Sequence, residues 1–269
     1  MRQRLHLGRS SRLTSYGLAD YSRLGRSSWG GYRASSSRPL WLLGALLLAL
    51  FILVALYYQS LSALDQLLTG WAGRAQSSSG RAPGPILVFL NWWGTWRGMV
   101  PTTVVGFLVL ALLYRRTREG WLLAGGMLSG WSLIELSKLF FLRPRPQGFH
   151  LFYAGGYSFP SGHALITALF TILFLYLAWP ALGRSFGDTN RGRVPSLIDL
   201  GYESYPRAGR ILRALVLLVL VGATLAVGWS RVYFGVHYPT DVLGGWLAGS
   251  FWAVVWILIT YQVRSRALG

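Results

Sequence analysis

Three short polar segments interrupt a chain that is otherwise strongly apolar, and their residue types could bind and transfer an anionic group. They are Lys138 with Arg143-Pro144-Arg145-Pro146, then Pro160-Ser161-Gly162-His163, and then Ser230-Arg231 followed by His237 and Asp241. Ionisable side chains at the ends of membrane helices are costly to maintain. A recurring set of cations and imidazoles at such positions therefore indicates a functional site.

The first segment offers two different cations for one anion. Lys138 is the only lysine of the chain, and Arg145 follows it in a turn that prolines restrict. A lysine supplies a compact point charge and an arginine a planar fork, which suits two oxygens of one phosphate. The alternative is that these cations only reach out to lipid headgroups, with Glu135 neutralising Lys138 one helical turn away.

The second segment is predicted to open a helix. Unpaired backbone N–H groups and the positive end of the helix dipole attract anions at such a start. Ser161 can supply a hydroxyl and the N-cap, and Gly162 lets a ligand approach the backbone. His163 then faces the same anion from the first turn. The alternative is an ordinary capping turn with an incidental histidine.

The third segment predicts an oriented imidazole. Asp241 follows His237 by four positions, a spacing that brings the two side chains together if the backbone is helical. A carboxylate bonded to one imidazole nitrogen fixes the tautomer and leaves the other nitrogen free as a nucleophile. The alternative is a structural histidine, with Asp241 as a favourable charge at a helix N-terminus. Each segment alone is weak evidence, but together they favour a phosphate-handling site.

The composition is that of a membrane protein. The chain is 53% hydrophobic, with 13 Trp, 14 Tyr and 13 Phe but only 8 acidic residues, which is unlike an ordinary soluble domain. The formal net charge of +18 could suggest a nucleic-acid partner, but the basic residues lie between apolar stretches and not on one soluble face. The absence of Cys excludes disulfides and cysteine-based metal sites.

Six apolar stretches, each about 20 residues long as a bilayer requires, predict an all-α protein with six transmembrane helices. They run roughly from Leu40 to Tyr58, Trp93 to Tyr114, Trp121 to Leu142, Gly162 to Leu182, Ile211 to Trp229 and Asp241 to Tyr261. Polar residues interrupt the start of the second stretch, and Ile86 to Leu90 could be a separate interfacial segment. Glycine pairs spaced by four, Gly126 with Gly130 and Gly245 with Gly249, predict close helix packing.

The positive-inside rule orients these helices. Most of the 26 basic residues lie on the side of the two termini, which predicts cytoplasmic termini and an extracytoplasmic face for all three polar segments. We expect residues 1–38 to be a disordered basic tail, with an organelle transit peptide as the alternative. Residues 39–263 would form the transmembrane domain, with a cytoplasmic loop at about 183–210, and residues 264–269 a short cytoplasmic C-terminus. His150 is interpreted as a solvated loop residue.

The polar segments resemble the three motifs of the type 2 phosphatidic acid phosphatase superfamily, which includes bacterial acid phosphatases and vanadium haloperoxidases. The motifs are Lys138, six residues and Arg145-Pro146; Pro160-Ser161-Gly162-His163; and Ser230-Arg231, five residues, His237, three residues and Asp241. No motif position is missing. The resemblance covers Lys138 to Asp241, and the six-helix pattern extends it to most of the chain but not to the tail before Pro39.

The resemblance implies a helical acid phosphatase/haloperoxidase-like core and a role for each residue. His237 would attack phosphorus to form a phosphohistidine, Asp241 would orient it, and His163 would protonate the leaving oxygen. The phosphoryl oxygens would be held by Lys138, Arg145, Ser161, Gly162 and Arg231. Neither a metal nor another cofactor is expected, because Lys138 and the two arginines supply the positive charge.

The function implied is a lipid phosphate phosphatase in a membrane, most simply the bacterial inner membrane. Undecaprenyl diphosphate is the first candidate substrate and phosphatidylglycerol phosphate the next, both by analogy with the family. One alternative is a phosphotransferase that passes the phosphoryl group to a lipid or sugar hydroxyl. Another is a non-catalytic lipid-binding or transport protein, which would not need a nucleophile, an orienting carboxylate and an acid together. Haloperoxidase activity fits less well, because it needs tightly held vanadate and a soluble setting. No protein partner is inferable.

Overall fold

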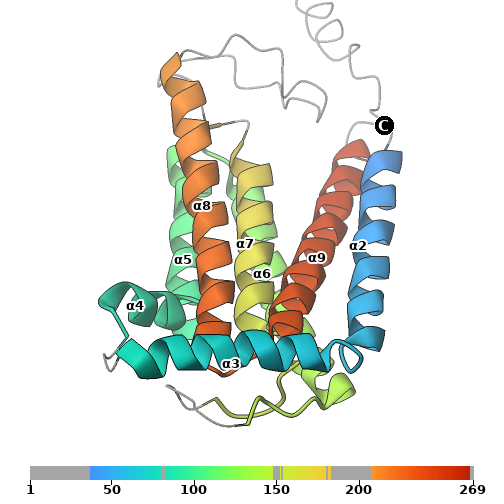
Figure 1. Ribbon diagram of the computed structural model, residues 1–269. Helices are drawn as coiled ribbons and strands as arrows, with labels where there is room; N and C mark the ends of the chain where they lie inside the picture. The colour runs from blue at the N-terminus through green and yellow to red at the C-terminus, as the bar shows by residue number, and fades with distance from the viewer. Residues whose placement is uncertain are drawn as a thin grey trace, which may run out of the picture.

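The computed structural model of the chain describes residues 37–79, 83–147, 152, 154–179, 181–182 and 207–266, and these residues form helices and loops without a strand (Figure 1). The helices are α2 (Arg38–Tyr57), α3 (Ser62–Ser79), α4 (Pro85–Trp93), α5 (Trp96–Leu108), the π-helical η1 (Val109–Leu113), α6 (Thr117–Phe141), α7 (Gly162–Ala178), α8 (Arg207–Tyr233) and α9 (Pro239–Arg266). The predicted all-α class is confirmed. Residues 1–36, His150, most of the 183–210 loop and the last three residues lie outside the described part.

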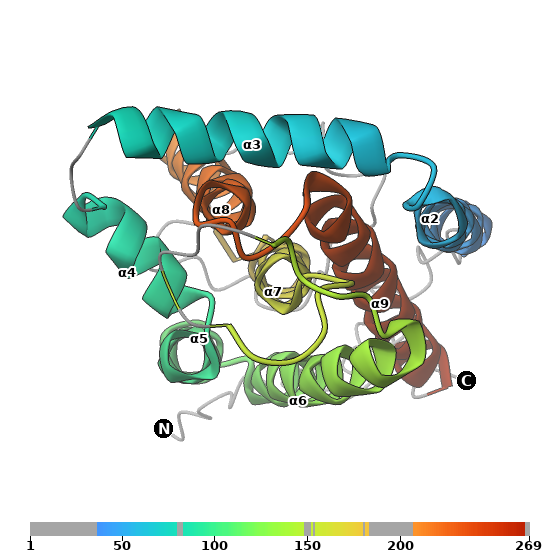
Figure 2. The same ribbon diagram turned by 60° about the horizontal axis from the view of Figure 1, so that its bottom comes forward.

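Helix α7 is the centre of the bundle. Figure 2 shows it end-on, with α5, α6, α8 and α9 around it. Its sequence is apolar on all sides, as expected of a helix with neighbours on every face, and Leu165, Ile166 and Leu169 are fully buried. The helices beside α7 run up and down past it, so the ends that carry the three polar segments all lie at the lower end in Figure 1.

The glycine pairs are close-packing points, as predicted. A Cβ added at Gly245 of α9 would lie 2.5 Å from the backbone oxygen of Ser161 and 2.8 Å from the Ala164 side chain. A Cβ at Gly126 of α6 would lie 2.5 Å from a methyl group of Leu173. The absence of side chains at these positions lets α6 and α9 approach α7 closely, which fixes the start of α7 against the start of α9.

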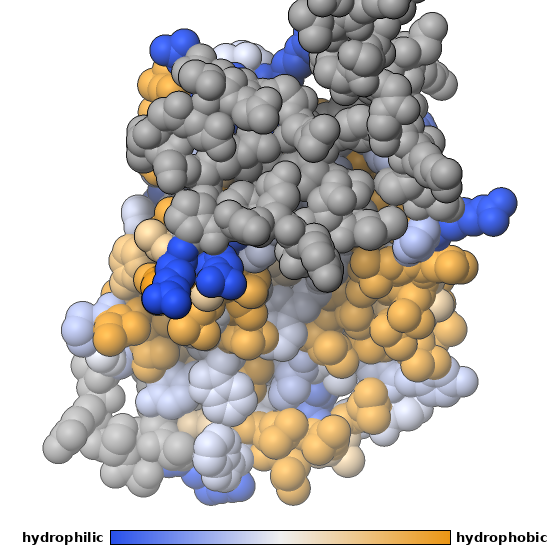
Figure 3. All heavy atoms as spheres, turned by 90° about the horizontal axis from the view of Figure 1, so that it is seen from above, coloured by the Kyte–Doolittle hydropathy of each residue, from blue (hydrophilic) through white to orange (hydrophobic). Residues whose placement is uncertain are grey.

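Four of the described helices are long and apolar enough to cross a membrane: α2, α5 with η1, α8, and α9 over Pro239–Gln262. Helix α7 is apolar but has only 17 residues, and α6 carries several charged residues. The predicted count of six spans is therefore not established by length and composition. Many large apolar side chains of the upright helices are exposed, such as Leu42 of α2 and Leu218 of α8, as expected for helices that face lipid. Hydrophobic residues also form much of the coloured surface seen from above in Figure 3.

Two further helices lie at the lower end, of which α3 was not predicted and α4 was considered as a separate segment. Helix α3 lies across the ends of the upright helices (Figures 1 and 2), and α4 is the separate segment suggested by Ile86 to Leu90. The second long helix begins at Trp96 and not at Trp93, because α4 ends at Trp93 and the chain turns at Gly94 and Thr95. Thr95 has extended backbone angles as the N-cap of α5.

Candidate active site

Local sequence places each polar segment at a helix end. Helix α6 ends at Phe141, and its C-cap Leu142 adopts left-handed backbone angles. The helix does not continue through Arg143, since a residue before proline avoids the helical region. Ser161 is the N-cap of α7. Pro239 occupies the first turn of α9, and the Asp241 carboxylate accepts the backbone N–H of Tyr238 at 2.8 Å, which resembles a capping box.

The three segments meet around one pocket of about 360 Å³. Six of the predicted site residues line it: Lys138, Arg145, Gly162, His163, Arg231 and His237. They come from α6, the α6–α7 loop, α7, α8 and the α8–α9 turn. Part of the remaining wall is apolar, formed by side chains such as Trp131 and Phe152. A pocket lined both by cations and imidazoles and by apolar side chains suits a ligand with a charged head and a hydrophobic body.

His237 has its two ring nitrogens in different surroundings. Its Nδ1 lies 3.5 Å from the Asp241 carboxylate and 3.5 Å from the Ser158 hydroxyl. Its Nε2 lies 3.2 Å from the Arg145 guanidinium. Burial lowers the pKa of His237 to about 4; Asp241 opposes this shift, and Arg145 and Arg231 add to it. The imidazole is therefore neutral near pH 7, with Nδ1–H directed at Asp241 and a lone pair on Nε2.

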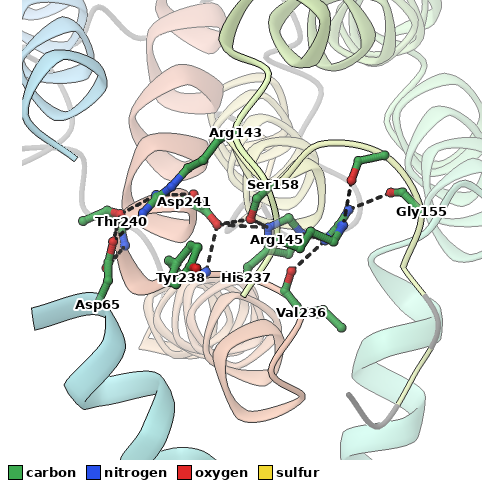
Figure 4. Close-up of polar contacts among 11 residues, drawn as sticks. Asp65, Arg143, Arg145, Gly155, Ser158, Val236, His237, Tyr238, Thr240 and Asp241 are labelled. Atoms are coloured by element: carbon green, nitrogen blue, oxygen red, sulfur yellow. Dashed lines mark hydrogen bonds and ion pairs between the residues drawn. The ribbon is translucent and has the colours of Figure 1, made fainter. Parts of the chain in front are cut away.

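Arg145 is fixed by backbone carbonyls. Its guanidinium donates to the carbonyl oxygens of Gly156 at 3.1 Å, Gly155 at 2.9 Å and Val236 at 2.7 Å. These bonds join the α6–α7 loop to the turn that carries His237 (Figure 4). Burial lowers the pKa of Arg145, and Asp241 opposes that shift. The cation is thus held beside the Nε2 atom of His237, and within the described part of the chain no carboxylate forms an ion pair with it.

His163 and Arg231 both contact Asn91, at the end of α4. The Nε2 atom of His163 lies 3.1 Å from the Asn91 carbonyl oxygen, which makes this nitrogen the donor. The Arg231 guanidinium donates to the side-chain oxygen of Asn91, and its Nε has no hydrogen-bond partner among the described residues although it is buried. One residue of α4 thus orients a predicted acid and a predicted phosphate ligand.

Ser161 lies just behind the pocket. Its side chain is fully buried, and its hydroxyl has no hydrogen-bond partner within the described part of the chain. Its backbone N–H donates to the Asp241 carbonyl at 2.9 Å, which joins the second segment to the third. Lys138, which lines the pocket, lies 3.8 Å from Glu135, so the partial neutralisation considered from the sequence does occur. Asp241 itself is fully buried and does not line the pocket.

Several contributors were missed from the sequence. Ser158 donates to the Asp241 carboxylate, Asn91 has the two contacts above, and Asp65 of α3 reaches the same cluster through Arg143. Arg143 was recognised from the sequence only as part of the first polar segment, without a role of its own. A polar residue inside an apolar run was the available signal for Asn91, which follows Ile86 to Leu90. Among the described residues, no group of three or more His, Asp or Glu side chains is placed to hold a metal ion.

Gly94 gives a steric test of the position of His163. A Cβ at Gly94 would overlap the His163 ring, lying 3.1 Å from its Cγ, and would lie 3.0 Å from a methyl group of Val227. We therefore expect Gly94→Ala to displace the imidazole and to lower turnover by about 10- to 100-fold, as small misplacements of catalytic groups do. Gly84→Ala is the matched control, because Gly84 is the N-cap of α4 and Gly94 is its C-cap. A Cβ at Gly84 meets nothing within 4 Å.

Phosphate release by the two purified variants, compared at equal folded fraction, measures this effect. Equal activity of Gly94→Ala and Gly84→Ala would show that turnover does not depend on this position of the His163 ring.

Comparison with known proteins extends the motif resemblance. The sequence model of the PAP2 superfamily matches residues 119–265. Dolichyldiphosphatase 1 of Mus musculus is 31% identical over 166 residues, which are 60% of this chain and 61% of the mouse protein. An undecaprenyl-diphosphatase of Sulfolobus acidocaldarius is 30% identical over 190 residues, covering 67% of this chain and 70% of that protein. The matched region is thus about three fifths of the mouse relative's length.

A solved structure shares the fold. It is the first transmembrane PAP2-type phosphatidylglycerolphosphate phosphatase from Bacillus subtilis, with a TM-score of 0.62 and 21% identity, covering 82% of this chain and 96% of that one. At that identity the match shows the fold and not the substrate. The family match over more than half of the chain, the membrane fold and the apolar helices lead to one conclusion: this chain is an integral membrane protein of the PAP2 superfamily.

Proposed function

We propose that this protein is a membrane lipid phosphatase that hydrolyses a phosphate or diphosphate headgroup through a phosphohistidine. The observation that carries the proposal is that both imidazoles, His163 and His237, line one pocket together with Lys138, Arg145 and Arg231. A nucleophile, an acid and three cations around one cavity are the groups that phosphoryl transfer needs.

The first chemical step is attack by His237 on phosphorus. The Nε2 lone pair forms a P–N bond while the bond from phosphorus to the leaving oxygen breaks. Asp241 accepts the Nδ1–H and stabilises the positive charge that develops on the ring. His163, starting as the imidazolium, gives its Nδ1 proton to the leaving oxygen while its Nε2–H stays bonded to the Asn91 carbonyl, so that the lipid alcohol or lipid phosphate departs neutral or with less charge.

In the second step, water attacks phosphorus and the P–N bond breaks. His163 now acts as base and takes the proton of the water, which returns both imidazoles to their starting states and releases inorganic phosphate. The charge on the equatorial oxygens is stabilised by Lys138, Arg145 and Arg231, together with the Ser161 hydroxyl and the backbone N–H groups that begin α7. We propose that these groups replace the metal ion that serves this purpose in kinases.

For the membrane arrangement, we propose that α2, α5 with η1, α6, α7, α8 and α9 all cross the bilayer. Helix α7 needs less length and apolar surface than an isolated span, because other helices surround it (Figure 2). The distribution of arginines supports cytoplasmic termini and an active site at the extracytoplasmic face. The bacterial inner membrane is the proposed location.

The substrate proposed first is a prenyl diphosphate such as undecaprenyl diphosphate. It is supported by the similarity to proteins named as undecaprenyl- and dolichyldiphosphatases and by a pocket that has cations and an apolar wall. Phosphatidylglycerol phosphate is the second candidate, which the name of the structural relative supports.

Phosphate release from purified full-length protein in detergent micelles tests the proposal. Prenyl diphosphates and phosphatidylglycerol phosphate are supplied separately, with and without EDTA. We expect release that EDTA does not lower, with prenyl diphosphates as the better substrates. Loss of activity in EDTA and its recovery with Mg²⁺ would contradict the metal-independent mechanism, while phosphorylated lipid in place of free phosphate would indicate a phosphotransferase.

A further inference from the structure

Arg143 lies behind the catalytic pair and not in the pocket. Its side chain is only 5% exposed. One guanidinium nitrogen donates to the Asp241 carboxylate at 2.5 Å and to the Thr240 hydroxyl at 2.8 Å, and another donates to the Asp65 carboxylate at 2.7 Å (Figure 4). The one buried cation bonds to both buried carboxylates, and removing it would leave them without a countercharge, so the three side chains form one unit.

The guanidinium of Arg143 also contacts two aromatic rings. Its central carbon lies 4.3 Å from the centre of the Tyr58 ring and 4.2 Å from that of Tyr238. Such cation–π contacts favour one plane for the guanidinium. The nitrogen that donates to Asp241 is therefore held in place by two aromatic rings as well as by Asp65.

Asp65 anchors this unit to α3. Its carboxylate is completely buried and accepts three hydrogen bonds: from Arg143, from the backbone N–H of Thr240 at 3.1 Å and from the Thr240 hydroxyl at 2.5 Å. Asp65 lies outside residues 119–265, to which the family match extends. The contact thus links a helix outside the matched region to the first turn of α9.

The two carboxylate oxygens of Asp241 have different hydrogen-bond partners. One oxygen is bound to Arg143. The other accepts the Ser158 hydroxyl and the Tyr238 N–H, and lies 3.5 Å from Nδ1 of His237. If Arg143 were absent, the carboxylate could rotate away from the imidazole, and it would face the Asp65 carboxylate without a cation between them.

We propose that Asp65 and Arg143 are positioning residues, through which α3 sets the orientation and effective charge of Asp241 beside His237. This inference rests on the proposed function, because it matters for turnover only if His237 is the nucleophile. The two residues do not touch the substrate pocket and act only through Asp241.

Removing the Arg143 charge and removing the Asp65 charge should shift the pH dependence of turnover in opposite directions. His237 faces Asp241 of α9, Arg145 of the loop, Arg231 of α8 and His163 of α7. Because it attacks as neutral imidazole, the rate falls as the pH drops through its pKa of about 4. This fall in rate at low pH is the acid limb of the pH profile. Loss of the Arg143 cation favours the imidazolium and moves the acid limb to higher pH by about one unit. Loss of the Asp65 anion disfavours the imidazolium and moves the acid limb to lower pH by about the same amount.

The experiment compares Asp65→Asn, Arg143→Gln and the double variant, in micelles with a prenyl diphosphate. Each single variant should lower kcat by about 10- to 100-fold with KM changed by less than about twofold, because the ground-state contacts to the headgroup remain. The acid limb should move in opposite directions in the two single variants. The double variant should lose no more than the worse single one, since both act through one carboxylate.

Two further variants separate positioning from folding. Arg143→Lys keeps the charge but not the fork, so it should keep the acid limb of the wild type while lowering kcat. Trp71→Leu removes the ring contact between α3 and Trp229 and should leave both kcat and the limb unchanged. If Arg143→Gln does not fold, Arg143→Lys and Asp65→Asn still decide the question.

The inference is overturned if folded variants keep the wild-type kcat and acid limb, or if they lose only thermal stability. It is also overturned if the acid limbs of Asp65→Asn and Arg143→Gln move in the same direction. These results leave the proposed function intact. If instead the wild type releases no phosphate from lipid phosphates, the proposed function fails, and NMR titration of ¹³C-labelled His237 still shows whether the two substitutions shift its pKa in opposite directions.

Discussion

His237→Gln is expected to abolish phosphate release, lowering kcat by about 10⁴-fold or more, because loss of a covalent nucleophile leaves only binding and electrostatic effects. The Nε2 atom of His237 lies beside Arg145 at the pocket, and no other described histidine has a carboxylate behind it. Glutamine keeps a polar side chain of similar size, so the buried cluster should persist.

Two measurements check this prediction. Steady-state phosphate release gives the loss in kcat, and acid-free quenching after incubation with ³²P-labelled substrate detects a phosphoenzyme that is stable to alkali, as phosphohistidine is. The wild type and His150→Gln should form it, and His237→Gln should not. Undiminished turnover by His237→Gln would exclude this residue as the nucleophile.

His163→Gln has the second largest expected effect, and the effect depends on the leaving group. An alkyl phosphate needs a proton on the departing oxygen, so its first turnover should slow by about 10³-fold without the general acid. An aryl phosphate such as p-nitrophenyl phosphate departs as a stable anion, so its first turnover should slow far less. The pocket position of His163, held by the Asn91 carbonyl, is the structural basis.

Rapid mixing of enzyme with each substrate separates the two steps. With the aryl phosphate, His163→Gln should release one equivalent of phenol quickly and then stall, because no base activates water against the phosphohistidine. Equal first-turnover losses on both substrates would show that His163 is not the acid for the leaving group.

The helical fold could be predicted because its signals are local. Apolar stretches mark the long helices, and serine, proline and glycine at defined positions mark where α7 and α9 begin. Helix α3 could not be predicted in this way, since it mixes polar with apolar residues and its short apolar segments do not fill a bilayer span. The count of spans could not be predicted in this way either, because the length and composition of a helix that other helices surround, such as α7 (Figure 2), do not show by themselves whether it crosses the membrane.

The chemical groups of the site and the helix ends that carry them could be read from the chain, since a spacing such as that from His237 to Asp241 lies within about one helical turn. The meeting of Asp65 and Arg143, 78 positions apart, behind Asp241 could not, and neither could the contacts of Asn91 with both His163 and Arg231. The reason is physical: a contact within one turn follows from backbone geometry, whereas a contact between distant residues follows from how whole helices pack, here around α7 and its glycine contacts.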